Sequence, residues 1–307
     1  MIKTIRIGTR DSELALWQAN TVQDKLRHLG YQTEIVAVKS TGDIILDKPL
    51  YEFGITGIFT KTLDVAMITG QVDIAVHSMK DVPTALPKGI VQAAVLKRAN
   101  VLDILVHKGN TDFLHSAGTI ATGSLRRQAQ WLHRHPNHSV VDLRGNVNTR
   151  LQKLRDNDWD GAVFAAAGLE RIQLKPDNHI ELPWMIPAPA QGAMVIVAMH
   201  DDFYCREAVG KLNHLDTQIC TQIERDFLRT LEGGCTAPIG ALATIVDNKI
   251  SFEGALFSLD GKDKIAIQKE TQIDLYQDFG ELCAQEILSN GGIDIMRQIK
   301  SSLNKDI

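Results

Sequence analysis

At 307 residues the chain can bury two or three hydrophobic cores, so more than one domain is expected. Hydrophobic residues at 44% and charged residues at 23% are usual for a globular protein, and no apolar run is long enough to span a bilayer. The net charge of −4, without a block of Lys or Arg, excludes a dedicated nucleic-acid-binding protein. The N-terminus lacks the apolar core of a signal peptide, which predicts a cytoplasmic location.

The first hundred residues alternate short β-branched runs with amphipathic segments, the pattern of βαβ units and a mainly parallel sheet. The expected strands and helices, in chain order, cover residues 5–8, 13–29, 33–38, 59–68 and 73–76. The last strand runs into a polar motif that contains Ser78, Lys80 and Asp81. Ligands bind outside the carboxyl ends of strands in open α/β sheets, so these three residues are candidates for a binding site.

A second series of alternating elements follows residue 98. Its expected strands and helices cover residues 103–106, 118–122, 125–133, 139–143, 146–155 and 160–165. Three prolines between residues 183 and 189 then interrupt the chain before Gln191, and a buried strand is expected at 194–199. A return of the chain to the first domain at this point would place Gln191 in a cleft.

The last hundred residues have a different pattern, with a long helix, three alternating strands and two further helices. The helix and strands are expected at residues 216–231, 241–246, 250–257 and 265–270. Strands grouped together and followed by helices predict a small α+β domain with an antiparallel sheet. The fold class is therefore α/β, with two α/β domains and a small C-terminal α+β domain.

Arginines are the most informative feature for function. Six of them sit in short polar links at strand ends or in the first turns of helices: Arg10, Arg126, Arg127, Arg144, Arg150 and Arg171. Guanidinium groups bind carboxylate and phosphate through paired hydrogen bonds, and helix N-termini add N–H donors. A phosphate-binding glycine motif is missing, so a ligand with carboxylate groups is favoured over one with phosphate groups. The alternative is that each arginine is a surface residue or half of an ion pair.

Asp81 lies beside Lys80 at the predicted strand end. A carboxylate there can stabilise a developing cation and exchange a proton with a leaving amine. The alternative is a loop aspartate that caps the turn at Val82-Pro83.

The four cysteines, Cys205, Cys220, Cys235 and Cys283, are widely spaced, so neither a disulfide framework nor a metal site is expected. Three of them are expected to be small buried residues. Cys235 follows two glycines in a turn between a helix and a sheet, where packing gives no reason for a cysteine. A covalent or nucleophilic role for Cys235 follows as a hypothesis, although no partner base is visible.

Seven motifs, in order, are similar to those of one family. The chain resembles the hydroxymethylbilane synthase (porphobilinogen deaminase) family over nearly its whole length. The motifs are Ile7-Gly8-Thr9-Arg10-Asp11-Ser12, Ala75-Val76-His77-Ser78-Met79-Lys80-Asp81-Val82-Pro83, Gly123-Ser124-Leu125-Arg126-Arg127, Leu143-Arg144-Gly145-Asn146-Val147, Ala166-Ala167-Gly168-Leu169, Pro187-Ala188-Pro189-Ala190-Gln191-Gly192 and Leu231-Glu232-Gly233-Gly234-Cys235.

The resemblance implies two domains like those of periplasmic binding proteins and a third that carries the cofactor cysteine. The expected boundaries are 1–98 with 194–214, then 99–193, then 215–307. Cys235 would hold a dipyrromethane through a thioether, as a primer for four porphobilinogen units that join with loss of ammonia. Hydrolysis would then release the linear tetrapyrrole hydroxymethylbilane. A monomer without a nucleic-acid or membrane partner is expected.

The resemblance also assigns residues. Asp81 would be catalytic, because its carboxylate would stabilise the cation that ammonia loss creates. The cofactor would be bound by Cys235, Ser12, Ser78, Lys80, Asp81, Ser124, Arg126, Arg127, Arg144 and Arg150. The substrate would be bound by Arg10, Ser12, Arg144, Arg150, Arg171 and Gln191. Each pyrrole bears an acetate and a propionate, which accounts for so many arginines.

One loop departs from the family pattern. Many relatives carry lysines where this chain has Glu52 and Thr56, and a basic residue at Thr41. We expect residues 47–60 still to form a lid over the cleft, but to contribute less to anion binding.

Two alternatives belong to other classes. A solute-binding module would share the two-domain architecture, but the signal-peptide pattern is missing and Cys235 would have no purpose. A thiol hydrolase would need a histidine near Cys235, and the one candidate within a motif, His77, fits a structural role better.

Overall fold

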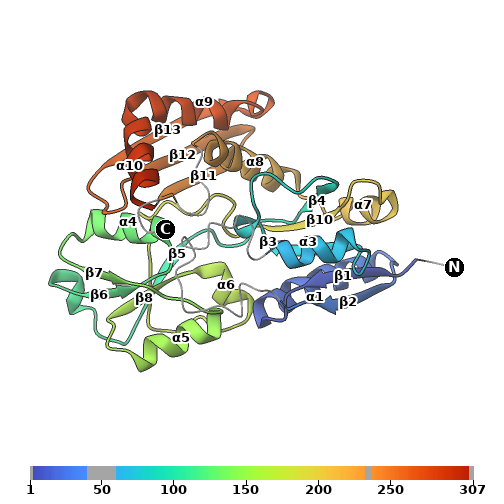
Figure 1. Ribbon diagram of the computed structural model, residues 1–307, viewed down its shortest axis with the longest axis horizontal. Helices are drawn as coiled ribbons and strands as arrows, with labels where there is room; N and C mark the ends of the chain where they lie inside the picture. Colours follow the sequence, from blue (N-terminus) through green and yellow to red (C-terminus); the bar gives the residue numbers. More distant parts are fainter. Residues whose placement is uncertain (1–2, 40–59, 232–236, 304–307) are drawn as a thin grey trace. The chain divides into compact units, whose positions relative to one another are not determined.

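The computed structural model describes residues 3–39, 60–231 and 237–303 (Figure 1). The described residues form two compact units. Unit 1 contains those up to residue 99 together with 191–219, and unit 2 contains 100–190 together with those from 220 onward. Each unit is organised around its own sheets.

The sheet of unit 1 has the strand order β2-β1-β3-β10-β4. Three adjacent strands pair in parallel: β1 (Ile5–Thr9), β2 (Thr33–Ala37) and β3 (Ile74–Ser78). The strand β10 (Met194–Met199) returns from much later in the chain and runs antiparallel between β3 and β4 (Ile90–Val95). The carboxyl ends of β1 and β3 therefore lie at one edge of the sheet.

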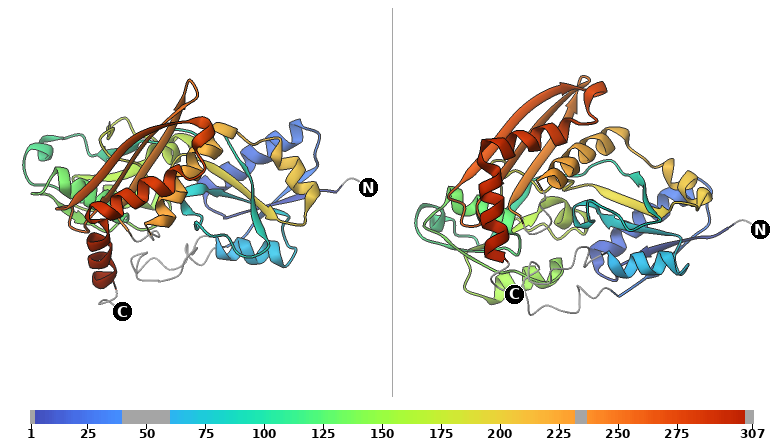
Figure 2. Two further views of the ribbon diagram at one scale, coloured as in Figure 1. Left: turned by 90° about the horizontal axis from the view of Figure 1, so that it is seen from above. Right: turned by 45° about the horizontal axis from the view of Figure 1, so that its top comes forward.

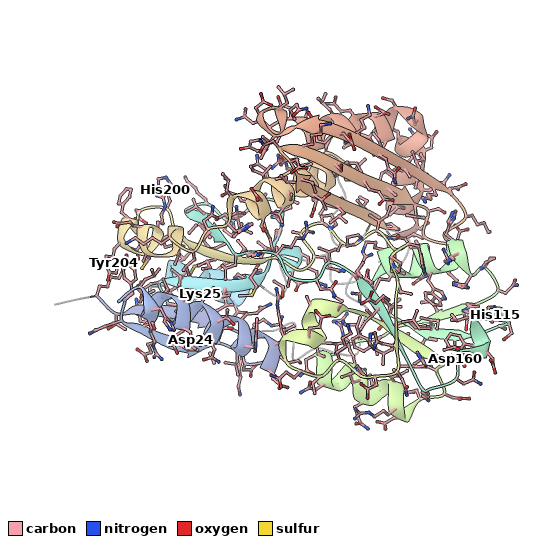
Figure 3. The ribbon with its side chains drawn as sticks, turned by 180° about the vertical axis from the view of Figure 1, so that it is seen from behind. Asp24, Lys25, His115, Asp160, His200 and Tyr204 are labelled. Atoms are coloured by element: carbon pink, nitrogen blue, oxygen red, sulfur yellow. The ribbon has the colours of Figure 1, made fainter. Side chains whose placement is uncertain are left out.

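Helix α1 (Glu13–His28) shows why a helix forms after β1. Its Val22 and Leu26 are fully buried in the core with β1 and β3, whereas Asp24 and Lys25 are exposed (Figure 3). This spacing gives one apolar face and one polar face. Unit 1 also contains the helices α3 (Lys61–Ile68) and α7 (Phe203–Gly210).

The first sheet of unit 2 has the order β7-β6-β8-β5-β9. Its parallel strands are β6 (Thr119–Ala121), β7 (Ser139–Val141) and β8 (Gly161–Ala165). The strands β5 (Asp103–His107) and β9 (His179–Glu181) complete it with antiparallel pairings.

Three helices follow strands of this sheet, α4 (Leu125–Arg134), α5 (Val147–Asp156) and α6 (Ala166–Arg171). The first two begin with side-chain caps. Ser124 accepts a hydrogen bond from the Arg127 N–H, and Asn146 accepts one from the Thr149 N–H. These caps fix where each helix starts relative to the strand before it.

Unit 2 also holds an antiparallel sheet of β11 (Ile239–Val246), β12 (Lys249–Phe257) and β13 (Lys264–Gln272). Asp247 and Asn248 join β11 to β12 with positive φ at both positions, as a two-residue hairpin turn requires.

Three helices accompany this sheet: α8 (Leu215–Thr230), α9 (Phe279–Ile287), which packs on β12 and β13, and α10 (Ile293–Leu303) (Figure 2). Phe227 and Phe252 meet edge to face with ring centroids 5.1 Å apart, so α8 is packed on this sheet.

The predicted fold class is confirmed, and every predicted strand and helix is found where the structure describes the chain. The expectation of mainly parallel sheets is confirmed in strand direction, since four of the five strands in each of the two five-stranded sheets run the same way. In each five-stranded sheet two of the four pairings are antiparallel, because β10 and β5 insert against the direction of their neighbours. The three-domain boundaries stay a prediction. Among the described helices none is long and apolar enough to cross a membrane.

Candidate active site

A pocket of about 60 Å³ lies in unit 1 at the carboxyl ends of β1 and β3. Three segments form it: the link from β1 to α1 with the first turns of that helix, the end of β3, and the 3₁₀ turn Met79–Asp81. Its lining residues are Arg10, Ser12, Leu14, Ala15, Gln18, Val76, His77, Ser78 and Asp81. Four of the predicted site residues, Arg10, Ser12, Ser78 and Asp81, are therefore brought together.

The hydroxyl groups of the pocket are available for a ligand. Ser12 is the N-cap residue of α1 by its backbone conformation, but its side chain makes no capping hydrogen bond. The Oγ atom of Ser78 accepts a hydrogen bond of 2.8 Å from the Gln18 amide. The Ser78 hydroxyl can therefore donate its own proton elsewhere. Gln18 itself, buried on α1, was not recognised from the sequence.

His77 also lines the pocket and is 6% exposed. Burial, and after it the nearby Arg10 guanidinium, lower the pKa of His77 to about 4. The ring is therefore neutral at neutral pH.

Lys80 and Gln191 meet within unit 1. The Lys80 ammonium donates to the Gln191 side-chain oxygen at 3.3 Å, and Arg98 donates to the Gln191 backbone carbonyl at 2.8 Å. Gln191 is fully buried, so it orients Lys80 from inside unit 1. Arg98 was not singled out in the sequence, since its target is 93 residues away.

Arg126 and Arg127 of unit 2 share a buried carboxylate, Asp103. Arg126 donates to one Asp103 oxygen at 2.7 Å, and Arg127 donates twice to the other, at 2.7 and 3.1 Å. Further donors go to the carbonyls of Ile186 and Val163. Much of the hydrogen-bonding capacity of these arginines is therefore taken up by the protein.

The cluster nevertheless keeps anion-binding character. Two guanidinium groups surround one carboxylate, so the Asp103 cluster carries an excess of one positive charge. The Nε atom of Arg126 is buried and has no hydrogen-bond partner among the described residues. Burial lowers the pKa of Arg126, although the Asp103 charge opposes this. Asp103 was missed in the sequence, although a charged residue opening an apolar strand was the available signal.

The other three predicted arginines lie in different settings within unit 2. Arg144 is buried, and burial lowers its pKa. Burial likewise lowers the pKa of Arg171, the last residue of α6, to about 10 against the opposing charge of Glu170. Arg150 donates from Nε to the Gly145 carbonyl at 2.7 Å. All three side chains are thus at least partly buried.

Cys235 lies outside the described residues, as do Thr41, Glu52, Thr56 and all but the last residue of the predicted 47–60 lid. Cys205, Cys220 and Cys283 are buried, as predicted. Burial raises the pKa of Cys205 to about 12 and that of Cys283 to about 11, so neither is a reactive thiol.

Two family models match the chain. "Porphobilinogen deaminase, dipyromethane cofactor binding domain" matches residues 5–207, and "Porphobilinogen deaminase, C-terminal domain" matches residues 218–289. This chain belongs to the porphobilinogen deaminase family. It is therefore similar to enzymes of tetrapyrrole biosynthesis, and the unit 1 pocket and the Asp103 cluster both fall inside the cofactor-binding match.

Curated relatives from the same family match this chain over nearly its full length. A porphobilinogen deaminase of Pelotomaculum thermopropionicum is 39% identical over 100% of both chains, and one of Pelobacter propionicus is 38% identical over 97% of both. Among solved structures, the Bordetella pertussis BvgS periplasmic VFT2 domain aligns with 68% of this chain and 86% of its own, at 12% identity and a TM-score of 0.43.

Proposed function

We propose that this porphobilinogen deaminase family member condenses four porphobilinogen molecules head to tail, with loss of ammonia, and releases hydroxymethylbilane after hydrolysis. The observation that carries the proposal is the unit 1 pocket. It combines the Asp81 carboxylate with the Arg10 guanidinium and the hydroxyls of Ser12 and Ser78. One carboxylate for a developing cation, among donors for carboxylates, is what this substrate needs.

The donor set fits the cofactor of the family. A dipyrromethane attached to Cys235 would supply the pyrrole end to which substrate units are added. Its acetate and propionate groups would be bound by Ser12, Ser78, Lys80, Ser124, Arg126, Arg127, Arg144 and Arg150. The unpartnered Nε atom of Arg126 supports this, because a buried N–H donor without an acceptor is costly unless a ligand provides one.

Asp81 is the proposed catalytic residue. As ammonia leaves the substrate, positive charge develops on the pyrrole, and a carboxylate close to it lowers the energy of that state. The same carboxylate can exchange a proton with the departing amine. Lys80, oriented by Gln191, adds positive charge for carboxylate binding from the neighbouring position.

Substrate side chains would be bound by Arg10, Ser12, Arg144, Arg150, Arg171 and Gln191. Arg126 and Arg127 act through the excess positive charge of the Asp103 cluster as much as through direct hydrogen bonds. The three-domain division at 1–98 with 194–214, 99–193 and 215–307, a monomeric state and a cytoplasmic location complete the proposal. Gel filtration of the purified protein tests the monomer.

Mass spectrometry of the intact protein tests the function. We expect an adduct of dipyrromethane mass on the peptide that contains Cys235, together with ammonia and linear tetrapyrrole release from porphobilinogen. Cys235→Ser should lack the normal adduct, whereas Cys220→Ala, a change at a buried thiol, should keep it. A folded wild-type protein without adduct and without ammonia release would rule the proposal out.

A further inference from the structure

Gln130 is a buried residue on helix α4, one turn after Arg126, and 3% of it is exposed. Both ends of its side-chain amide bind the backbone of one residue. The Gln130 Oε1 atom accepts a hydrogen bond of 2.8 Å from the Ile186 N–H, and the Gln130 Nε2 atom donates one of 2.9 Å to the Ile186 carbonyl. This pair of bonds fixes the direction in which the Ile186 carbonyl points.

Arg126 uses the same carbonyl. Its Nη1 atom donates to the Ile186 oxygen at 2.6 Å, and its Nη2 atom donates to Asp103 at 2.7 Å. A carbonyl oxygen can accept from Gln130 and Arg126 together. The guanidinium group is therefore held between two acceptors, and one of them is held in turn by Gln130. Other N–H groups of Arg126 remain for a ligand, among them Nε–H, which has no hydrogen-bond partner among the described residues.

Arg127 shows why this support is needed. It donates from Nη1 to the carbonyl of Val163 at 3.0 Å. Val163 belongs to β8 and pairs with β5, so the sheet itself positions that carbonyl. Ile186 lies outside the helices and strands, between β9 and β10. Gln130 therefore does for the Ile186 carbonyl what the sheet does for the Val163 carbonyl.

Packing alone does not explain an amide at this position of α4. The Ile186 side chain belongs to a core cluster with Ala129, Ala255 and Phe257, and a Cβ atom added to Gly240 would lie 2.9 Å from the Ile186 Cβ. These contacts already place Ile186 between α4 and the sheet that contains β11 and β12. Apolar contacts have no preferred direction, so they do not orient a carbonyl group. If only burial were needed, an apolar side chain would serve as well as an amide.

We propose that Gln130 is a positioning residue for the cofactor: by holding the Ile186 carbonyl, it fixes the Arg126 guanidinium in the orientation that binds a carboxylate of the dipyrromethane. The inference rests on the proposed function and deepens it, because it names a residue that acts on cofactor binding through Arg126. A guanidinium group binds a carboxylate through directed, paired donors, so its orientation matters as well as its charge.

Gln130→Met tests these hydrogen bonds, because methionine has a similar length and no N–H donor. Cofactor-free protein can be produced in a host that cannot make porphobilinogen and then incubated with porphobilinogen. We expect the variant to acquire the dipyrromethane mass about tenfold more slowly than wild type. Gln128→Met, on the same helix but at a partly buried position, is the matched control and should load at the wild-type rate.

A second change separates positioning from a structural role. Arg126→Lys keeps the charge but has no guanidinium group to orient. If Gln130 acts through Arg126, adding Gln130→Met to Arg126→Lys should slow loading by less than about twofold. A merely structural role predicts the same loss in both backgrounds, with a matching fall in Tm, and that result would overturn the proposal. A wild-type protein that never acquires the mass would instead overturn the proposed function.

A measurement without any change at Gln130 covers variants that fail to fold. In Cys235→Ser, which should lack the cofactor, the Arg126 guanidinium should already be held by Ile186 and Asp103. Its Nη protons should then give separate NMR resonances, because rotation about the Nε–Cζ bond is blocked. Adding Arg126→Lys removes these resonances and so assigns them. Averaged resonances would show a freely turning guanidinium group and would contradict the proposal.

Discussion

Unit 1 and unit 2 place the same kinds of side chain at the ends of parallel strands and use them differently. In unit 1, Arg10, Ser12 and Asp81 line a pocket. In unit 2, Arg126 and Arg127 also begin a helix after a strand, but their guanidinium groups close around Asp103 inside the unit. One arrangement presents its polar groups to a ligand, and the other binds most of them internally.

The comparison shows that the position of an arginine along the chain does not decide what it binds. Arg127 sits in the first turn of α4, a favourable place for an anion ligand, yet two of its donors reach a carboxylate from β5. Burying charges is tolerated there because they are paired and hydrogen-bonded. Substitutions of the unit 1 pocket residues should therefore change activity. Substitutions in the Asp103 cluster should mainly lower stability.

The largest expected effect is on the chemical step. Asp81→Asn keeps the shape of the side chain but removes the carboxylate, so kcat should fall by about 10²–10⁴-fold. The dipyrromethane mass measured for the intact protein and its Tm should be close to wild type. Asp11→Asn, an exposed aspartate outside the pocket lining, should retain wild-type kcat. A fully active Asp81→Asn variant would remove the catalytic assignment.

Removing the shared carboxylate of unit 2 should lower stability, whereas the Asp81 change lowers kcat. Asp103→Asn leaves two buried guanidinium groups without their counter-charge, so the free energy of unfolding should drop by about 3–5 kcal/mol. Urea unfolding measures this. Asp112→Asn, at an exposed aspartate of the same unit, should change it by less than about 0.5 kcal/mol. A small effect at Asp103 would mean that the cluster is not a charged core.

The fold was largely predictable because the spacing of hydrophobic residues along the chain changes where one helix or strand ends and the next begins. Strand β1 and helix α1 follow directly from that pattern. Strand β4 was not predicted, and the antiparallel course of β10 was also missed. Those two strands pair with each other across more than ninety residues, and local periodicity carries no information about pairing partners.

The candidate site was predictable only in part, for a related reason. Ser78 and Asp81 were found because they follow a strand directly, which is a local feature. Asp103 was not found because its importance depends on Arg126, 23 residues further along the chain. The missing hydrogen-bond partner of His77 is likewise a property of its three-dimensional surroundings, and no spacing in the sequence reveals it.

Acid should lower the stability of the folded protein through His77. Its pKa is about 4 in the folded protein and 6.5 in the unfolded chain, so the unfolded chain binds a proton that the folded protein excludes. Above pH 6.5 both states are neutral. As the pH falls from 6.5 to about 4, the free energy of unfolding should decrease by about 3 kcal/mol from this residue, and below that range the loss should level off. His77→Gln should lose correspondingly less stability between neutral pH and about pH 4.5. If urea unfolding shows the same loss of unfolding free energy for wild type and His77→Gln over this pH range, the assignment is contradicted.

The smallest expected effect separates the two regions most directly, because it compares one arginine from each. Arg10→Ala should raise KM for porphobilinogen about tenfold to a hundredfold, the effect of losing a charge-assisted hydrogen bond, with little change in Tm. Arg10→Lys keeps the charge but not the paired donors, so its KM should lie between that of Arg10→Ala and wild type. Arg127→Ala leaves Asp103 paired with Arg126 but removes two hydrogen bonds to one buried Asp103 oxygen, so its main effect should be a lower Tm. If instead Arg10→Ala unfolds easily and Arg127→Ala changes only KM, the roles assigned to the two regions are reversed.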